Sequence, residues 1–220
     1  MQVLAGDTPP TSGRVWIDGK PIGSYKPNEL ALHRAVLPQY SLLQFAFTVR
    51  EVAEMGRAPH DDTHEEALTI VNQALAATEM TAFAERVYPS LSGGEKARAQ
   101  LSRVLAQQAP ILLLDEPTAS LDLRHQQHVM DIARDVASAG GTVVAVVHDL
   151  NLAAGSGDRI VLLHKGQVAA DGSPWDVMQN GLLSDVYQCE IAVTRHPLRD
   201  CPLVMALGRD RLPANGNPPG

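Results

Sequence analysis

The sequence predicts an α/β fold into which an all-helical subdomain is inserted. Three observations lead to this prediction. The apolar run Ile111–Asp115 is typical of a central parallel strand that is covered on both faces. Strand patterns flank residues 41–108, and within those residues the patterns are helical. After that stretch, helical and strand patterns alternate up to about residue 190, as they do in parallel α/β sheets.

The first 40 residues are predicted to form short elements of the α/β core. Met1–Ala5 resemble the last turn of a helix, and Gly6 stands where a helix usually stops. Residues 13–22, GRVWIDGKPI, favour two short strands joined by a tight Asp-Gly turn. A short helix capped by Asn28 and a brief strand ending at Gln39 follow.

Helix-start signals recur between residues 41 and 108. Thr48, Thr63 and Ser92 are each followed three residues later by Glu, which is the spacing of a capping box. Gly56 is expected to end the first of these helices. These signals account for the predicted helical subdomain.

The remaining elements follow the alternating pattern of the core. A helix is predicted from about Leu123 to Ser138, and the next strand is predicted to end at His148. A strand pair is expected around Lys165–Gly166, followed by a helix that Ser173 caps.

Composition and charge limit the classes of function. The chain has 220 residues, of which 45% are apolar and 20% charged, and its formal net charge is −7. This charge argues against a general nucleic-acid binder, which would have a basic surface. The longest apolar runs are far shorter than the roughly 20 residues of a membrane span. Cys189 and Cys201 have no metal-ligand spacing, so we expect reduced thiols in a cytosolic protein.

The first stretch that indicates chemistry is LLLDEP, residues 112–117. Asp115 and Glu116 follow a buried parallel strand, and α/β sheets bind ligands at this end of their strands. One carboxylate together with phosphate oxygens suits Mg²⁺, and the neighbouring carboxylate can accept a proton from an attacking water. The alternative is a pair of carboxylates held by helix caps or by arginines.

The second stretch is LSGGE, residues 91–95. Ser92 and Glu95 have capping-box spacing, so a plain helix cap is one interpretation. Gly93 and Gly94 cost a helix about 1 kcal/mol each relative to alanine. Bare backbone N–H groups at the positive end of a helix would instead suit an anion. His148 and Gln39, each expected at the end of a strand, would carry no functional meaning alone.

In this order along the chain, LSGGE, DEPTASLD at 115–122 and a strand-ending histidine resemble the ATP-binding subunits of ABC transporters. The resemblance implies a RecA-type P-loop NTPase core, incomplete at its N-terminus, with an inserted helical subdomain. It places the core at residues 1–40 and 109–190, the helical subdomain at 41–108, and a partly disordered tail at 191–220. It also implies that ATP and Mg²⁺ are the cofactors.

The same resemblance assigns roles to individual residues. The implied catalytic residues are the general base Glu116, the switch histidine His148 and the Q-loop glutamine Gln39. The implied metal ligands are Asp115, which closes the Walker B strand, and Gln39. The implied nucleotide-binding residues are those of the signature motif and the D-loop: Ser92, Gly93, Gly94, Glu95 and Asp122.

One expected motif does not occur in these residues. Members of this family carry G-x-x-x-x-G-K-[ST], whose backbone cradles the phosphates. Gly19-Lys20 does not fit this pattern, because Arg14 stands at the first glycine position and Pro21 follows the lysine. We therefore expect that the loop lies just before Met1 in a longer parent protein, or that this is a short, non-hydrolysing form. In either case these 220 residues are expected neither to bind ATP tightly nor to hydrolyse it.

The stretch from Gln39 to His60 resembles importers of iron chelates, vitamin B12 and haem, and the pieces that carry this resemblance are VLPQ at 36–39, FTVREV at 47–52 and GRAPH at 56–60. Other stretches favour the hemin importers. The implied partners are a second ATPase subunit, a membrane permease and, indirectly, a periplasmic binding protein, at the cytoplasmic face of the bacterial inner membrane. Residues 41–60, with Tyr40, Phe45 and Phe47, are expected to dock the permease. Alternatively, the phenylalanines only fill the subdomain core.

Two other classes of function share part of this pattern. Chromosome-maintenance ATPases share these motifs, but they insert a long coiled coil where this chain has a short segment without sustained heptads. A non-hydrolysing scaffold or regulatory subunit stays open, because the phosphate loop does not occur in these residues.

Overall fold

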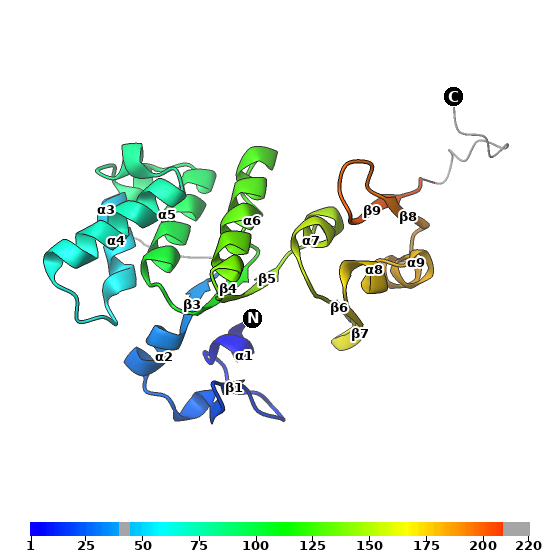
Figure 1. Cartoon of the computed structure of the whole chain (residues 1–220), viewed down its shortest axis with the longest axis horizontal. Coiled ribbons are helices and arrows are strands. Elements are labelled where there is room, and N and C mark those ends of the chain that lie inside the picture. The colour runs from blue at the N-terminus through cyan, green and yellow to red at the C-terminus, as the bar shows by residue number, and fades with distance from the viewer. Residues whose placement is uncertain (40–44, 209–220) are drawn as a thin grey trace. The chain divides into compact units, whose positions relative to one another are not determined.

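The computed structural model describes residues 1–39 and 45–208 (Figure 1). The chain divides into two compact units, Met1–Val147 and His148–Gly220, which are described separately. In the described residues, no helix is both long and apolar enough to cross a membrane.

The N-terminal elements of the first unit agree with those predicted from the sequence, except for the start of one helix. Helix α1 (Gln2–Ala5) ends at Gly6, whose φ is 80°. Strands β1 (Trp16–Ile17) and β2 (Lys20–Pro21) are antiparallel, and Asp18 and Gly19 between them both have positive φ. A 3₁₀ turn, η1 (Ile22–Ser24), follows.

Helix α2 (Pro27–His33) begins before Asn28, which was wrongly expected to cap it. Its N-cap is Lys26, whose N–H donates to the Glu29 carboxylate. Proline suits the first helical position because its φ is fixed and its missing N–H is not needed there.

A parallel sheet lies at the centre of the first unit. Its strands, among the described residues, are β3 (Arg34–Leu37), β4 (Ile111–Asp115) and β5 (Thr142–Val146), with β4 in the middle. The prediction that Ile111–Asp115 forms a central strand is therefore confirmed. Gln39 and His148 do not end strands as expected, since each lies two residues beyond the last residue of its strand.

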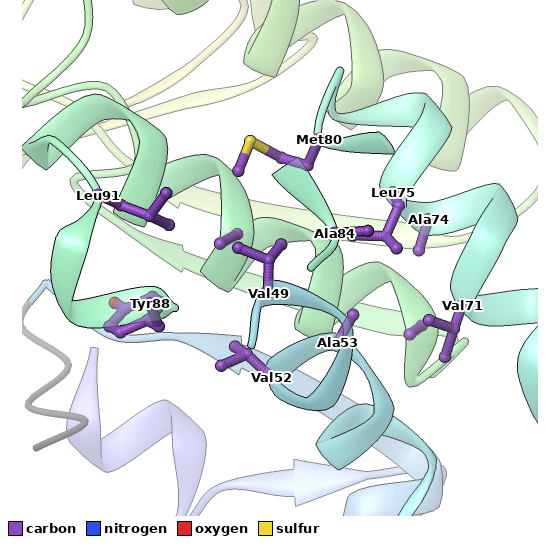
Figure 2. Packing of buried hydrophobic residues seen from close by; sticks show 12 residues of the cluster. Val49, Val52, Ala53, Val71, Ala74, Leu75, Met80, Ala84, Tyr88 and Leu91 are labelled. Atoms are coloured by element: carbon purple, nitrogen blue, oxygen red, sulfur yellow. The ribbon is translucent and has the colours of Figure 1, made fainter. Parts of the chain in front are cut away.

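Between β3 and β4 the named elements are all helical. The α-helices are α3 (Val49–Glu54), α4 (His64–Ala77) and α5 (Gly93–Ala106). Short 3₁₀ turns connect them: η2 (Met55–Arg57), η3 (Thr81–Phe83) and η4 (Tyr88–Ser90). The three predicted capping boxes are present at Thr48, Thr63 and Ser92. Figure 2 shows the core that these helices share, in which Val49, Val71 and Leu75 are almost fully buried.

Helix α5 belongs to two hydrophobic clusters at once. Ala99 and Ala106 pack into the helical cluster of Figure 2. Leu101 and Val104 pack into a second cluster with the sheet strands and with α6 (Leu123–Ser138). The middle and C-terminal part of α5 therefore pack against both parts of the first unit.

The second unit combines hairpins with short helices. Its elements are α7 (Leu150–Ser156), β6 (Ile160–His164), β7 (Gln167–Gly172), α8 (Pro174–Val177), α9 (Asn180–Tyr187), β8 (Ile191–Arg195) and β9 (Pro202–Ala206). The β8–β9 hairpin was not predicted, because that region was expected to belong to the tail. The Asn151 side chain of α7 fixes the hairpin by pairing with both backbone groups of Val204. Residues 209–220 lie outside the described residues.

Candidate functional site

The acidic pair lies where the central strand of the parallel sheet ends. Asp115 is the last residue of β4 and is paired in register with Val146 of β5. Glu116 follows with φ of 51°, and its N–H donates to the Val146 carbonyl at 3.0 Å. A left-handed backbone costs a non-glycine residue roughly 1–2 kcal/mol, and such conformations cluster at functional sites. Both carboxylate residues are half-buried.

The loop that follows is held in a defined conformation by hydrogen bonds. The Ala119 N–H donates to the Glu116 carbonyl at 3.3 Å, and the Leu121 N–H donates to the Thr118 carbonyl at 3.2 Å. From α6, the Gln126 side-chain amide donates to the carbonyls of Thr118 and Leu121. The loop therefore enters α6 as an ordered turn.

Asp122 caps the helix at the end of this loop. Its Oδ1 accepts the His125 N–H at 2.9 Å and lies 2.8 Å from His125 Nδ1. These bonds, the backbone one first, lower the pKa of the Asp122 carboxyl. In this structure the side chain assigned to nucleotide binding by resemblance serves as the N-cap of α6.

The signature stretch begins α5 with a complete capping box. The Glu95 N–H donates to Ser92 Oγ at 3.3 Å, and the Ser92 N–H donates to Glu95 Oε2 at 2.7 Å. The bonds to Ser92 lower the pKa of Glu95. The N–H groups of Gly93 and Gly94 have no acceptor inside the helix, as expected of its first turn. They are the backbone donors that an anion at this helix end would use.

The two glycines differ in their surroundings. A Cβ added to Gly94 would lie 3.3 Å from the Ser120 carbonyl oxygen and 3.4 Å from Leu121 Cδ2. A Cβ added to Gly93 would come no closer than 3.9 Å to Ser120 Cβ. The start of α5 therefore lies directly against the loop 119–122. Ser120 and Leu121 were not predicted as site residues, although a glycine inside a first helical turn signals such a close approach.

The other residues assigned by resemblance lie at chain positions beyond the strands. Gln39 is exposed in a bend after β3, and the register of Leu37 with Leu114 places the ends of β3 and β4 at the same edge of the sheet. His148 is the first residue of the second unit.

The described residues form no group of three or more His, Cys, Asp or Glu side chains that could hold a metal ion. A site of few protein ligands, such as Asp115 with Gln39, is consistent with a Mg²⁺ ion that also binds phosphate oxygens and waters.

Comparison with known sequences identifies many relatives. A family model described as ABC transporter matches residues 1–119. A hemin import ATP-binding protein from Thermobifida fusca is 50% identical over 207 residues, which span 93% of this chain and 73% of that protein. Proteins of the same description from Streptomyces coelicolor and Gloeobacter violaceus are 50% and 47% identical, with 93% and 94% of this chain and 74% and 79% of those proteins covered.

Solved structures agree with the predicted fold. A dimeric ATP-binding cassette in a post-hydrolysis state with ADP and Pi is 28% identical, with a TM-score of 0.71 over 78% of each chain. An inward-facing transporter of the metal-chelate type has a TM-score of 0.77 over 94% of this chain and 81% of that one; at 23% identity it supports the fold alone. These likenesses confirm the predicted core of the RecA type with its helical subdomain.

Proposed function

Because this chain belongs to the ATP-binding proteins of ABC transporters, we propose that it is the energy-coupling subunit of an importer that takes up hemin. The observation that carries this proposal is the 50% identity, over 93% of the chain, to hemin import ATP-binding proteins. In this architecture the ATPase does not contact the cargo, so the substrate is inferred from relatives and not from a binding site on this chain.

The end of β4 is the proposed centre of ATP hydrolysis. Asp115 would bind Mg²⁺ with Gln39, and the ion when bound would neutralise charge on the phosphates. Glu116 would accept the proton of the attacking water, and its left-handed backbone turns the chain immediately after the strand. By the same resemblance, His148 is proposed as the switch histidine. In support of these roles, an acidic pair at the carboxyl end of a parallel strand is suited to phosphate chemistry.

We assign the start of α5 to a second chain's nucleotide. Ser92, Gly93, Gly94 and Glu95 present a helix N-terminus to an anion, with Asp122 beside them in the adjoining loop. One chain cannot easily close both this segment and the β4 end onto one phosphate, whereas two chains arranged head to tail can. The dimeric state of a related cassette supports this arrangement.

The partners follow from the proposed role. A membrane permease would bind near residues 41–60, where the Phe45 side chain is 73% exposed and stacks edge-on against Phe47. Of these two described phenylalanines, Phe47 packs on the helical core, so Phe45 is the one available to contact a partner. Tyr40 and Leu42 lie outside the described residues. A periplasmic binding protein would deliver the hemin, and the subunit would act at the cytoplasmic face of the inner membrane.

Growth on defined iron sources tests this proposal. Cells from which the gene for this chain is deleted should fail to grow with hemin as the iron source, and the intact gene should restore growth. Growth on a ferric siderophore should be unchanged, as should vitamin B12-dependent growth. Loss of growth only on the siderophore, or only under B12 dependence, would assign the subunit to one of those importers. Unchanged growth in every condition would remove it from import.

A further inference from the structure

Glu79, just beyond the end of α4, has an unusual conformation and several charged neighbours. Glu79 lies two residues beyond Ala77 and has φ of 57°, a value that favours glycine. Its carboxylate accepts a hydrogen bond from Arg124 Nη2 of α6 at 2.5 Å. On the other side, Glu79 Oε2 lies 3.8 Å from Arg98 Nη1 of α5. One side chain thus joins a cation on each of two helices.

Arg98 depends on this neighbour because it is buried. The residue is only 9% exposed, and its Nε is a buried donor with no hydrogen-bond partner among the described residues. Its Nη1 reaches the Glu79 carbonyl at 3.5 Å in addition to the carboxylate. A buried guanidinium without a nearby anion is strongly unfavourable. Glu79 and Glu95 are the carboxylates that interact with it in the described structure.

The charged contacts of Glu79 extend to the first turn of α6, next to Asp122. His125 of α6 lies between two carboxylates, with Nδ1 2.8 Å from Asp122 and Nε2 3.8 Å from Glu79. The hydrogen bond from Arg124, with the positive groups around it, lowers the pKa of Glu79, so its carboxylate is ionised at neutral pH. Alternating charges therefore connect the first turn of α5 to the first turn of α6.

We propose that Glu79 is a positioning residue that holds the signature segment 92–95 in register with the loop 119–122. It acts through Arg98, one turn after Glu95, and through Arg124 and His125, which follow Asp122. The inference rests on the proposed function to the extent that these two segments are the ones assigned to nucleotide. It adds a residue that lies in neither segment.

The ion pair between Arg124 and Glu79 is partly exposed. The side chains of Arg124 and Glu79 are 69% and 37% exposed, and an isolated pair of this kind contributes little to stability. The contact with buried Arg98 differs, because loss of the Glu79 charge leaves that guanidinium with one carboxylate fewer. We therefore expect a local effect on the two segments and a small effect on global stability.

Amide hydrogen exchange of the 220-residue chain, resolved by NMR, tests the proposal without nucleotide. The reporters are amides that are hydrogen-bonded in the first turns of the two helices: Glu95, Lys96, His125 and Gln126. Glu79→Gln removes the charge with little change of shape. Glu79→Gly removes the carboxylate while favouring the left-handed backbone. The control is Glu65→Gln, an exposed position on the first turn of α4.

In both Glu79 variants the four reporter amides should exchange roughly fivefold faster, while amides in the middle of α4 stay unchanged. Raising the salt to 1 M should bring the unaltered protein toward the variants, because screening weakens the charge contacts. The proposal is overturned if the reporters do not change, if only one segment responds, or if exchange rises equally throughout the first unit. Since no ATP is present, none of these results depends on the growth experiment.

Discussion

At the scale of single residues, different physical constraints explain why Gly93 and Gly94 of the signature stretch are glycines. Gly94 is in close contact with the Ser120 carbonyl, whereas Gly93 has space for a side chain. A helix cap alone explains neither glycine, because Ser92 and Glu95 already complete the capping box. The anion interpretation therefore applies most directly to Gly93, and Gly94 has a packing role as well.

Replacing each glycine separately by alanine distinguishes the packing role from the anion-binding role. We expect Gly94→Ala to be less stable than Gly93→Ala by about 1–3 kcal/mol, because its Cβ overpacks the loop 119–122. Gly93→Ala should be neutral or slightly stabilising, since alanine favours a helix. Urea denaturation of both variants measures the difference in the free energy of unfolding. Equal urea midpoints for the two variants would show that the loop 119–122 accommodates the methyl group at position 94 without loss of stability.

At the scale of elements, α5 is fixed at both ends. At its C-terminus, the stretch GRAPH supplies the partners of its last carbonyls. Arg57 Nη1 donates to the Ala106 carbonyl at 2.7 Å, and His60 Nε2 lies 2.8 Å from the Gln107 carbonyl. Hydrogen-bond donors, and the positive charge of Arg57, suit a helix C-terminus, where carbonyls lack partners. The stretch GRAPH, which resembles the importer family in sequence, thus also has a structural function.

Gly56 allows α3 and its 3₁₀ extension to approach α5 closely. A Cβ at Gly56 would lie 2.1 Å from the Arg103 carbonyl oxygen, so Gly56→Ala must separate the two helices. We expect a loss of about 3 kcal/mol in the free energy of unfolding. Gly23→Ala is the matched control, because Gly23 is also in a 3₁₀ turn and its Cβ would meet nothing within 4 Å. Thermal unfolding of the two variants should differ by many degrees, and similar melting temperatures would contradict the close approach.

The elements also show what could be predicted from the sequence. Capping boxes and the apolar run of β4 are local signals, and they located α3, α4, α5 and the central strand. The β8–β9 hairpin was missed because its region was expected to belong to the tail, and one contact that fixes it comes from Asn151, about 50 positions away. The contact of Gly94 with Ser120 and the bridge at Glu79 likewise join segments distant in sequence. Such long-range contacts leave no periodic pattern in the chain.

At the scale of the whole molecule, the predicted site roles become testable when the phosphate loop is supplied. The pattern G-x-x-x-x-G-K-[ST] does not occur in the 220 residues, and the backbone and lysine of that loop hold the β- and γ-phosphates. We therefore design a chimera in which this loop, with the strand before it, precedes Met1. The 220-residue chain alone is the matched control, and we expect its dissociation constant for Mg-ATP to be above about 1 mM.

In the chimera, two substitutions at the end of β4 should have opposite effects. Glu116→Gln should retain ATP and accumulate as a dimer, because a carboxamide cannot accept the proton of the attacking water. Asp115→Asn should remain a monomer, because it weakens the binding of Mg²⁺ and hence of ATP. Size-exclusion chromatography in Mg-ATP, with the nucleotide content of each peak measured, distinguishes the two. A Glu116→Gln protein that elutes as a monomer with ATP bound would refute a nucleotide site shared between two chains, since it would show that one chain holds ATP without the other's Ser92–Glu95 segment.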